Sequence, residues 1–580
     1  MMSCARLAAE EKGFSPLCAN VREVVERRTM QSQQHDCNDG LSMQDRFLAQ
    51  TLDDARHDYR TSLGSEADGG WDWVVVTASN ERQAAAYRVQ IDSRLKKGLL
   101  PEKTQYLVVP DRDGRRVGSG GATLSALVEI AFRVGMDSLS SQKVLLLHSG
   151  GDSKRIPQYS AKGKLFAPTP HEGIDGGRST IFDDIMVSMS GVPQRMQCGT
   201  LVAPSDTVVV FNPLQLDLSV DAVALSMKAG VDEGTQHGVF GAHGDGKVAA
   251  FLHKAPERIL HAHGAVDGKG LVDIDTGCIW LGKPVIEAVL GLFRKGISLD
   301  DERFRLYSGP EACLSLYADF IYPLAVESTL EGYLGQTPEG AFTPELKSCR
   351  LGLWEALRGL SIDLVRLTPS RYIHFGTTWE TLDLLAGSDG KYAHLGWRRQ
   401  VCSSCSPSVR AALNNVVVEE GCTVGAGSYV ENAVIGGAAA VGEGSIVSGI
   451  DVSGRAIPDG TVFHGMQLED GRWVCRVYGV RDNPKESSGG AFLGTTLDAV
   501  IERTGVRQHD VWGEAPASIW NARIYPVRDM QEGALDAALA LCRIASGEAA
   551  EGEIADWLEA DRESLSSGFD RADIARAEAR

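Results

Sequence analysis

The chain has 580 residues, of which 43% are hydrophobic and 23% charged, so it can hold several domains and has the composition of a soluble globular protein. Its formal net charge of −19 argues against nucleic acid as a partner, because binding to a phosphate backbone needs a basic surface. No apolar run approaches the roughly 20 residues that cross a bilayer, so we expect a cytoplasmic protein with no membrane partner.

The first 70 residues mix charged side chains with Gln, Ser and Asp and lack the apolar stretch of a secretory signal. We therefore expect a poorly ordered N-terminal extension over residues 1–70. Strand and helix patterns then alternate, with strands predicted over residues 73–77, 107–109, 144–147 and 200–203, and helices over residues 81–97, 122–134 and 180–189. Nearly continuous apolar strands between helices indicate an α/β fold with a mostly parallel sheet covered on both faces. In such sheets, ligands bind at the carboxyl ends of the strands.

A glycine-rich loop follows the second of these strands. It contains Arg115 and Arg116, and then the run Gly118, Ser119, Gly120 and Gly121. Backbone N–H groups at the start of a helix bind phosphate well, because they are unpaired and the helix dipole favours negative charge there. The run lacks the ending of a Walker loop and the acidic residue of a dinucleotide fingerprint. A surface turn is the alternative for a single run of this kind.

A second basic loop follows the third strand, which ends in Gly150 and Gly151. This loop carries the cations Lys154, Arg155, Lys162 and Lys164. Glycine lets a backbone approach a ligand closely, and the four cations supply charge for an anion. Two basic glycine-rich loops, each after a strand, predict phosphate binding rather than two surface turns. Since salt limits long-range fields to about 8 Å, a local cationic site is compatible with an acidic protein.

Residues 213–395 have a less regular pattern, and a repeat begins near residue 416. Apolar residues recur five or six positions apart, with glycine and other small residues between them: Val418, Val424, Val430, Ile435, Val441, Val447, Val452, Ile457 and Phe463. This repeat predicts a left-handed parallel β-helix over residues 410–470, with a glycine-rich β-meander as the alternative. A C-terminal region over residues 471–580 is expected to hold a strand at 473–478 and helices from about residue 532.

Six segments resemble, in their order and spacing, the fucose-1-phosphate guanylyltransferase family of GDP-fucose pyrophosphorylases. They are VGSGGATL (117–124), SGGDSKRIP with GKLF (149–166), APSDTVVVF (203–211), DTGCIWL (275–281), YIHFGTTWE (372–380) and IWNARIYPV (519–527). The likeness covers about residues 73–527 and implies a Rossmann-like nucleotidyltransferase domain over residues 71–395. Members occur alone or as the front half of a bifunctional fucokinase/GDP-fucose pyrophosphorylase. The chain has no kinase loop of the Gly-Leu-Gly-Ser-Ser type, so we do not expect the fucokinase half in it. A stand-alone enzyme and a front-half fragment both stay open.

The resemblance implies that L-fucose 1-phosphate attacks the α-phosphorus of GTP, giving GDP-L-fucose and pyrophosphate. Catalysis of this kind depends on positioning and electrostatics, because both substrates are anions. Lys164 matches the family lysine that contacts the reacting phosphates, and Arg155 is the second candidate. The triphosphate is expected at Arg115, Arg116, Gly118, Ser119, Gly120 and Gly121.

The resemblance also implies Mg²⁺, since Asp206 lies where the superfamily keeps a metal-binding carboxylate after a strand. The usual second ligand is the Asp of a D-x-G-T motif, which here reads His374-Phe375-Gly376-Thr377. Imidazole suits Mg²⁺ poorly, so His374, Gly376 and Thr377 are expected to contact sugar or phosphate. Asp319 and Asp275 are alternative ligands. We assign Asp275 to the substrate, because Asp275-Thr276-Gly277 resembles a sugar-hydroxyl-binding segment.

Three other functions stay open. A hexapeptide-repeat acyltransferase would use the β-helix and a catalytic histidine, for which His464 is the candidate. A regulator that binds a nucleotide sugar without turnover would be expected to lack Lys164, Arg155 and Asp206, which are present. A pyrophosphorylase for another sugar phosphate or base would use the same chemistry.

The flanks of left-handed β-helices often pack between subunits, so the β-helix predicted over residues 410–470 fits a homo-oligomer.

Overall fold

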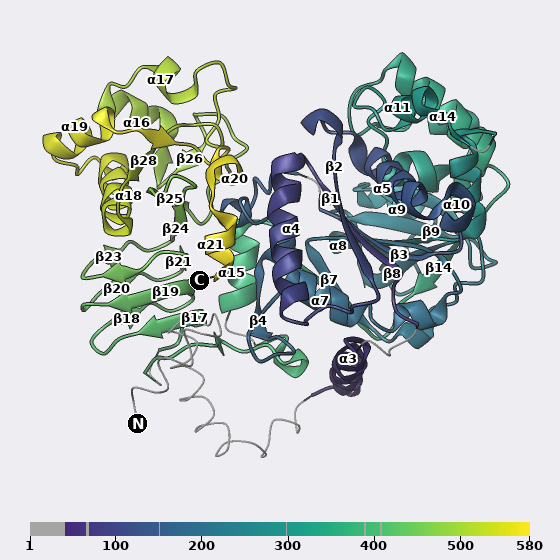
Figure 1. The fold of residues 1–580 in the computed structure, drawn as a ribbon, viewed down its shortest axis with the longest axis horizontal. Helices are drawn as coiled ribbons and strands as arrows, with labels where there is room; N and C mark the ends of the chain where they lie inside the picture. The colour runs from purple at the N-terminus through teal and green to yellow at the C-terminus, as the bar shows by residue number, and fades with distance from the viewer. Residues whose placement is uncertain are drawn as a thin grey trace. The chain divides into compact units, whose positions relative to one another are not determined.

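The computed structural model describes residues 41–64, 69–149, 151–296, 298–387, 390–406 and 409–579 (Figure 1). It shows a mixed α/β protein whose chain forms two compact units. Among the described residues, the sheet unit takes those of Arg46–Gly151 and Asp184–His374, and the ladder unit takes those of Asp152–Asp183 and Phe375–Arg580 together with residues 41–45. Each unit is therefore built from stretches that are distant in the sequence.

The sheet unit is organised around a nine-stranded mixed sheet of order β10-β9-β11-β6-β3-β1-β2, in which β8 pairs with β11 and β14. Its strands are β1 (Trp73–Ala78), β2 (Gln105–Pro110), β3 (Lys143–His148), β6 (Gly199–Pro204), β8 (Ala222–Gly230), β9 (Gly238–Ala242), β10 (Val248–His253), β11 (Leu271–Leu281) and β14 (Ile362–Arg366). The pairings β1–β2, β1–β3, β3–β6 and β8–β14 are parallel. The four pairings that involve β9 or β11 are antiparallel. Among the described residues the sheet is thus equally parallel and antiparallel rather than mostly parallel.

Helices cover this sheet, and a short ribbon extends it. The helices that lie wholly in the unit are α4 (Glu81–Lys96), α5 (Gly118–Val134), α6 (Met136–Leu139), α8 (Val231–Gly234), α9 (Glu257–Ala262), α10 (Lys283–Gly291), α11 (Asp301–Tyr307), α12 (Tyr322–Leu324), α13 (Leu330–Leu334) and α14 (Pro344–Leu357). Helices α3 (Met43–Ser62) and α7 (Ile181–Ser188) contribute residues to both units. The ribbon pairs β7 (Thr207–Phe211) antiparallel with β15 (Ser370–His374). A short antiparallel pair, β12 (Arg294–Lys295) with β13 (Ser298–Leu299), lies apart from the main sheet.

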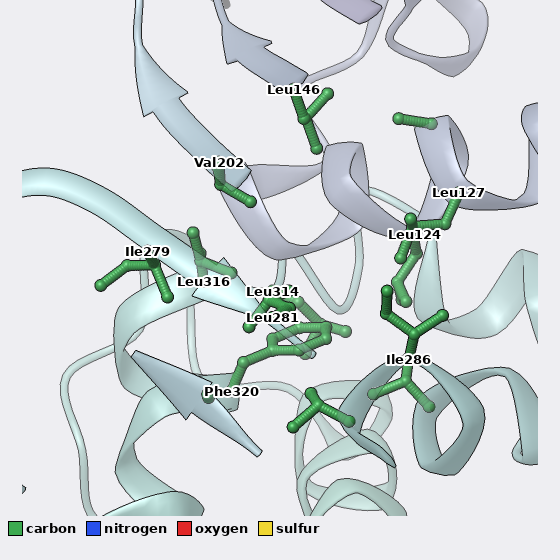
Figure 2. Close-up of a cluster of buried hydrophobic side chains, with 14 of the residues drawn as sticks. Leu124, Leu127, Leu146, Val202, Ile279, Leu281, Ile286, Leu314, Leu316 and Phe320 are labelled. Carbon is green, nitrogen blue, oxygen red and sulfur yellow. The ribbon is translucent and has the colours of Figure 1, made fainter. Parts of the chain in front are cut away.

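The core of the sheet unit joins α5 to the central strands (Figure 2). Leu124 and Leu127 of α5 lie in one buried cluster with side chains from β3, β6, β11 and α10. The same cluster includes Leu314, Leu316 and Phe320, which belong to the segment of residues 313–321. Burial of a large apolar side chain contributes about 1.5–3 kcal/mol, so this cluster fixes both α5 and residues 313–321 against the sheet.

Three ladders of short parallel strands form the centre of the ladder unit. The strands are β17 (Ala412–Val418), β18 (Thr423–Val424), β19 (Tyr429–Gly436), β20 (Ala440–Val441), β21 (Ile446–Ser448), β22 (Val452–Ser453), β23 (Ala456–Ile457) and β24 (Thr461–Gln467). In the first ladder, Leu413, Val430 and Val447 are paired partners, so successive strands lie 17 residues apart. The second ladder has the order β18-β20-β23, and the third passes from the end of β17 through β19 to β22.

The chain bends at matching positions between the first and third ladders. Asn415 and Asn432 have φ values of 58° and 50°, and Gly449 has a φ value of 68° one repeat later. Asparagine and glycine adopt this left-handed conformation more easily than other residues. The side chain of Asn415 also donates a hydrogen bond to Oδ1 of Asn432 at 3.0 Å. The bends therefore repeat with the same period as the strands.

The rest of the ladder unit adds further strands, both parallel and antiparallel, and helices. Its further strands are β4 (Pro168–Glu172), β5 (Arg178–Thr180), β16 (Gln400–Val401), β25 (Trp473–Gly479), β26 (Ala491–Phe492), β27 (Thr495–Thr496), β28 (Tyr525–Arg528) and β29 (Arg562–Glu563). Its helices are α15 (Thr378–Ala386), α16 (Leu497–Thr504), α17 (Gln508–Trp512), α18 (Gln531–Ser546), α19 (Glu551–Glu559), α20 (Gly568–Arg571) and α21 (Ile574–Ala579). Strand β25 pairs antiparallel with β24 along its whole length.

Most of the predicted elements are confirmed, and two details differ. Helix α5 begins at Gly118 rather than near Ala122. Part of the expected N-terminal extension is helical, because Leu48, Thr51 and Tyr59 of α3 are spaced to bury one face. The rest of that extension lies largely outside the described residues. Among the helices that are described, none has the length and apolar composition to cross a membrane.

Candidate functional site

The glycines at the start of α5 are required by close packing. A Cβ atom on Gly118 would lie 2.2 Å from the carbonyl oxygen of Leu314, and one on Gly120 would lie 2.7 Å from the ring of Phe320. The N–H group of Gly120 donates to the Leu314 carbonyl at 2.7 Å. The glycine-rich run therefore allows residues 313–321 to approach the first turn of α5, and one of the N–H groups of that turn is already used.

A carboxylate of the protein binds at the same helix terminus. Glu339 accepts hydrogen bonds from the Ser119 hydroxyl at 2.5 Å and from the Ser119 N–H at 3.3 Å. It also accepts from Arg116 Nη2 at 3.0 Å, while Arg115 Nη2 contacts Glu311 at 3.0 Å. The predicted triphosphate-binding groups thus do hold an anion, and that anion is the side chain of Glu339.

Two buried groups beside this terminus have shifted pKa values. Burial raises the pKa of Asp111 to about 6, although the Val117 N–H and Arg116 lower it, and Glu339 raises it further. Burial lowers the pKa of His148 to about 4, and its Nε2 lies 3.0 Å from the Thr123 hydroxyl. His148 is therefore a neutral ring at neutral pH.

Asp206 and His374 lie together at the end of β6. Asp206 occupies the turn between β6 and β7, and His374, the last residue of β15, pairs with Thr207. His374 Nε2 lies 3.8 Å from Asp206 Oδ2. The Tyr372 ring stacks on that of His374 at a centroid distance of 6.2 Å, and the His237 ring meets it edge-on at 6.5 Å. A carboxylate and aromatic rings thus share one surface.

Asp275 is presented by an irregularity in β11, where the register with β8 shifts between Asp275 and Ile279. Its Oδ1 accepts from the Gly277 N–H at 2.8 Å, and the Tyr317 hydroxyl also donates to it. Burial raises the pKa of the Asp275 carboxyl to about 7, against the lowering effect of these two donors. Burial thus favours the neutral form of the Asp275 carboxyl more than for an exposed aspartate.

Asp319 is part of an internal ion pair. Its side chain is fully buried, and it accepts from Arg350 Nε at 2.7 Å and from the Ser315 N–H at 2.6 Å. Arg350 also donates to the carbonyl groups of Leu334 and Gln336. The pair therefore fastens the loop that carries Glu339, and protein donors occupy both Asp319 oxygens, which favours a structural role over metal binding.

The ladder unit gathers four of the predicted residues. Lys164 Nζ lies 3.5 Å from the carbonyl oxygen of Phe375, next to Gly376. The Arg155 carbonyl accepts from the N–H of Thr378 at 2.9 Å. Thr377 is the N-cap of α15 and forms a capping box with Glu380. Lys164, Arg155, Gly376 and Thr377 thus meet at the start of α15.

The predicted residues therefore form three local groups. The α5 terminus belongs to the sheet unit, and so do Asp206, His374 and Asp275, where the charges of Asp206 and Asp275 both raise the pKa of Tyr372. The Lys164–Arg155 group belongs to the ladder unit. That Lys164 and the Gly118–Gly121 run serve one ligand stays a prediction. Within the described part of the chain, no three His, Cys, Asp or Glu side chains are arranged to hold a metal ion.

Several residues near these groups could not be predicted from local sequence patterns. Glu339 lies far along the chain from Ser119, and its position depends on the Arg350–Asp319 pair. The aromatic neighbours Tyr317 and His237 were also missed, because isolated aromatic residues are usually core residues. Tyr372 could have been found, since it begins the YIHFGTTWE segment.

A family model and several curated proteins match this chain, and their names agree. Residues 136–530 match the family described as the fucose pyrophosphorylase domain. The fucose-1-phosphate guanylyltransferase of Mus musculus is 27% identical over 504 residues, which cover 79% of this chain and 84% of that protein. The enzyme of the same name from Homo sapiens is 26% identical, with 79% and 81% covered. The bifunctional fucokinase/GDP-fucose pyrophosphorylase of Arabidopsis thaliana is 29% identical, with 80% of this chain but 47% of that protein covered.

The family match spans more than half of the chain and includes eight of the predicted site residues: Arg155, Lys164, Asp206, Asp275, Asp319, His374, Gly376 and Thr377. It does not extend to Arg115, Arg116 or the glycine-rich run. The relatives from mouse and human are similar to this chain over most of their own length. The chain belongs to the fucose pyrophosphorylase family.

Proposed function

We propose that this protein forms GDP-L-fucose and pyrophosphate from GTP and L-fucose 1-phosphate. The observation that carries the proposal is the family match over residues 136–530, with relatives named fucose-1-phosphate guanylyltransferase. Lys164 supports it, because its ammonium group lies beside the start of α15, where a cation and a helix N-terminus together suit phosphate. The Arg155 backbone is bonded to the same helix.

In this proposal, cations and helix termini neutralise the two substrates and align the attacking phosphate with the α-phosphorus. Lys164 and Arg155 contact the reacting phosphates, and Arg116 with the Ser119 N–H binds the triphosphate after Glu339 has moved away. Asp275 accepts a hydroxyl of the sugar, and the rings of Tyr372 and His374 pack against it. Gly376 and Thr377 lie against sugar or phosphate at the start of α15.

The Asp206 carboxylate, in the turn between β6 and β7, would be the protein's ligand for Mg²⁺. Mg²⁺ is usually bound by one or two carboxylates together with phosphate oxygens and water, and His374 is a poor ligand for it. When bound, the ion would supply positive charge against the phosphate oxygens. Asp206 is therefore the residue that we expect to hold it.

We further propose that the three ladders form one left-handed β-helix. The repeats of 17 residues, which shorten to 16 at the last step, and the matching bends at Asn415 and Asn432 support this arrangement. The predicted repeat residues are buried from Val424 to Phe463, and Val418 is half-buried. A cytoplasmic location and a homo-oligomer stay predictions.

Pyrophosphate release tests the proposal directly. Purified protein with GTP, L-fucose 1-phosphate and Mg²⁺ is expected to release pyrophosphate and to form GDP-L-fucose, measured by coupled assay and mass spectrometry. ATP and UTP, and mannose and glucose 1-phosphates, serve as the comparison panel. Binding of GDP-L-fucose without turnover would instead indicate a regulator, and acyl transfer from acyl-CoA would indicate the acyltransferase alternative.

Replacement of Lys164 tests the role of the ladder-unit group. We expect Lys164→Ala to lower kcat by about 10²- to 10³-fold, because a cation aimed at developing charge is lost. The variant should keep its thermal unfolding temperature, since the side chain is only half-buried. Lys485→Ala, at an exposed position of the same unit, is the control. Near-normal turnover of Lys164→Ala would refute the assignment.

A further inference from the structure

The loop that carries the two predicted catalytic cations is held in place along its middle. We call residues 152–166 the cationic loop. Arg155 is exposed and Lys164 is half-buried, but residues 156–161 between them are buried. Pro157–Tyr159 form a single 3₁₀ turn, which is too short to be stable alone. The contacts that hold this turn come from elsewhere in the ladder unit.

Arg476 of β25 makes the central contacts. Its side chain is fully buried, and its Nη2 donates to the Pro157 carbonyl at 2.9 Å. Its Nη1 donates to the Ser160 hydroxyl and to the Leu565 carbonyl, both at 3.3 Å. Its Nη2 also lies 2.7 Å from His464 Nδ1. The planar guanidinium group thus joins both ends of the 3₁₀ turn to the ladder strands.

His464 serves as an acceptor in this arrangement. Burial first, and then the charge of Arg476, lower the pKa of His464 well below its ordinary range. The ring is therefore neutral, and its Nδ1 can accept from Arg476. A buried, neutral histidine that is engaged in this way is poorly suited to the catalytic role in acyl transfer.

Three neighbouring contacts hold the remaining residues of the turn. The Tyr478 hydroxyl donates to Gln158 Oε1 at 2.7 Å. The Tyr159 hydroxyl donates at 3.2 Å to Glu431 Oε2, a buried carboxylate that also accepts from Tyr429 at 2.9 Å. The N–H of Thr378 holds the Arg155 carbonyl, as described above.

We propose that Arg476 is a positioning residue for nucleotidyl transfer, which acts by fixing the cationic loop so that Arg155 and Lys164 are presented correctly. A buried arginine is costly unless its donors are satisfied, and here they are divided between the loop, at Pro157 and Ser160, and the ladder unit behind it, at His464 and Leu565. A misplacement of about 1 Å at a reacting group lowers a rate by as much as 10²-fold. This inference rests on the proposed function, since it assigns Arg476 to that reaction.

The test compares two variants of the anchor with a control on the same strand. Arg476→Lys keeps the charge but loses the planar fork, and we expect kcat to fall about 10²-fold with a much smaller change in the KM for GTP. Tyr478→Phe removes the hydroxyl that bonds Gln158 and Thr378 but leaves the Arg476 contacts in place, and it should lower kcat about 2- to 10-fold. Val477→Ala alters a buried residue between them and should lower stability without lowering kcat.

Trypsin cleavage provides a measurement that does not depend on activity. Native Arg476→Lys protein should be cut after Lys154 and Arg155 faster than the wild type, whereas Val477→Ala should not. If kcat in all three variants follows their stability alone, or if Arg476→Lys keeps wild-type kcat and cleavage rate, the inference is overturned. If wild-type protein releases no pyrophosphate, the proposed function fails, and the cleavage comparison still decides whether Arg476 holds the loop.

Discussion

At single positions, the most informative contact is that of Glu339 with the start of α5. The carboxylate binds the hydroxyl and N–H of Ser119 and the guanidinium of Arg116, which are groups predicted to hold a triphosphate. An internal anion shows that these donors can bind negative charge. The Glu339 carboxylate must also move away before a phosphate can bind to the same donors of Ser119 and Arg116.

Replacement of Glu339 should strengthen GTP binding. In Glu339→Gln the competing charge is gone, so we expect the Kd for GTP, measured by calorimetry, to fall about 3- to 10-fold, the size of one lost charge-assisted hydrogen bond. Glu420→Gln, at an exposed position in the ladder unit, should leave the Kd unchanged. Weaker or unaltered GTP binding by Glu339→Gln would show that this terminus is not the triphosphate site.

The raised pKa of Asp275 predicts that the free energy of unfolding depends on pH. Its folded pKa of about 7 lies above the usual value for Asp, so the unfolding free energy falls as pH rises from about 4 to about 7. Asp275→Asn does not titrate and should be more stable than the wild type by roughly 1–3 kcal/mol at pH 8. The two proteins should unfold similarly at pH 4, and urea denaturation at both pH values measures the difference. An equal effect at both pH values would contradict this account.

Among the helices and strands, the start of α5 shows why local sequence patterns are insufficient to predict the candidate site. The apolar repeat from Val424 to Phe463 could be read from the sequence, because each residue packs against the next repeat. The first turn of α5 could not, because its glycines face residues 313–321, which are distant in the sequence. The Asp319–Arg350 pair was missed for the same reason. Local periodicity predicts elements well, whereas contacts between distant segments decide the site.

The close packing at the start of α5 predicts that one added methyl group destabilises the protein. Gly120→Ala should lower the free energy of unfolding by about 1–3 kcal/mol, because its Cβ would clash with the Phe320 ring. Gly291→Ala is the matched control, since no atom lies within 4 Å of the added Cβ at the end of α10. Chemical denaturation of both variants tests this, and equal stability would contradict the packing account.

For the chain as a whole, the compact units do not follow the order of the sequence. The predicted division at residues 71–395, 410–470 and 471–580 assigns the cationic loop to the first domain. The contacts group residues 152–183 with residues 375–580, and the predicted domain boundaries stay a prediction. Sequence patterns locate boundaries where composition changes, and they carry little information about which distant segments pack together.

Truncation tests this grouping. A protein that ends at residue 395 keeps every predicted site residue but loses Arg476, Tyr478 and Glu431, which hold the cationic loop. We expect it to lack pyrophosphate release and to be cut rapidly by trypsin after Lys154 and Arg155. An active, protease-resistant truncated protein would show that the loop is held without the ladder strands.

The pairing of residues 157–160 with β25 has a consequence for biosynthesis. While the ribosome is still translating, the buried turn has no partner until about residue 478 has emerged from the exit tunnel. More than three hundred further codons must therefore be translated before the side chains that bury this turn are available. Cells that make the protein should benefit from chaperones that shield this segment during that interval.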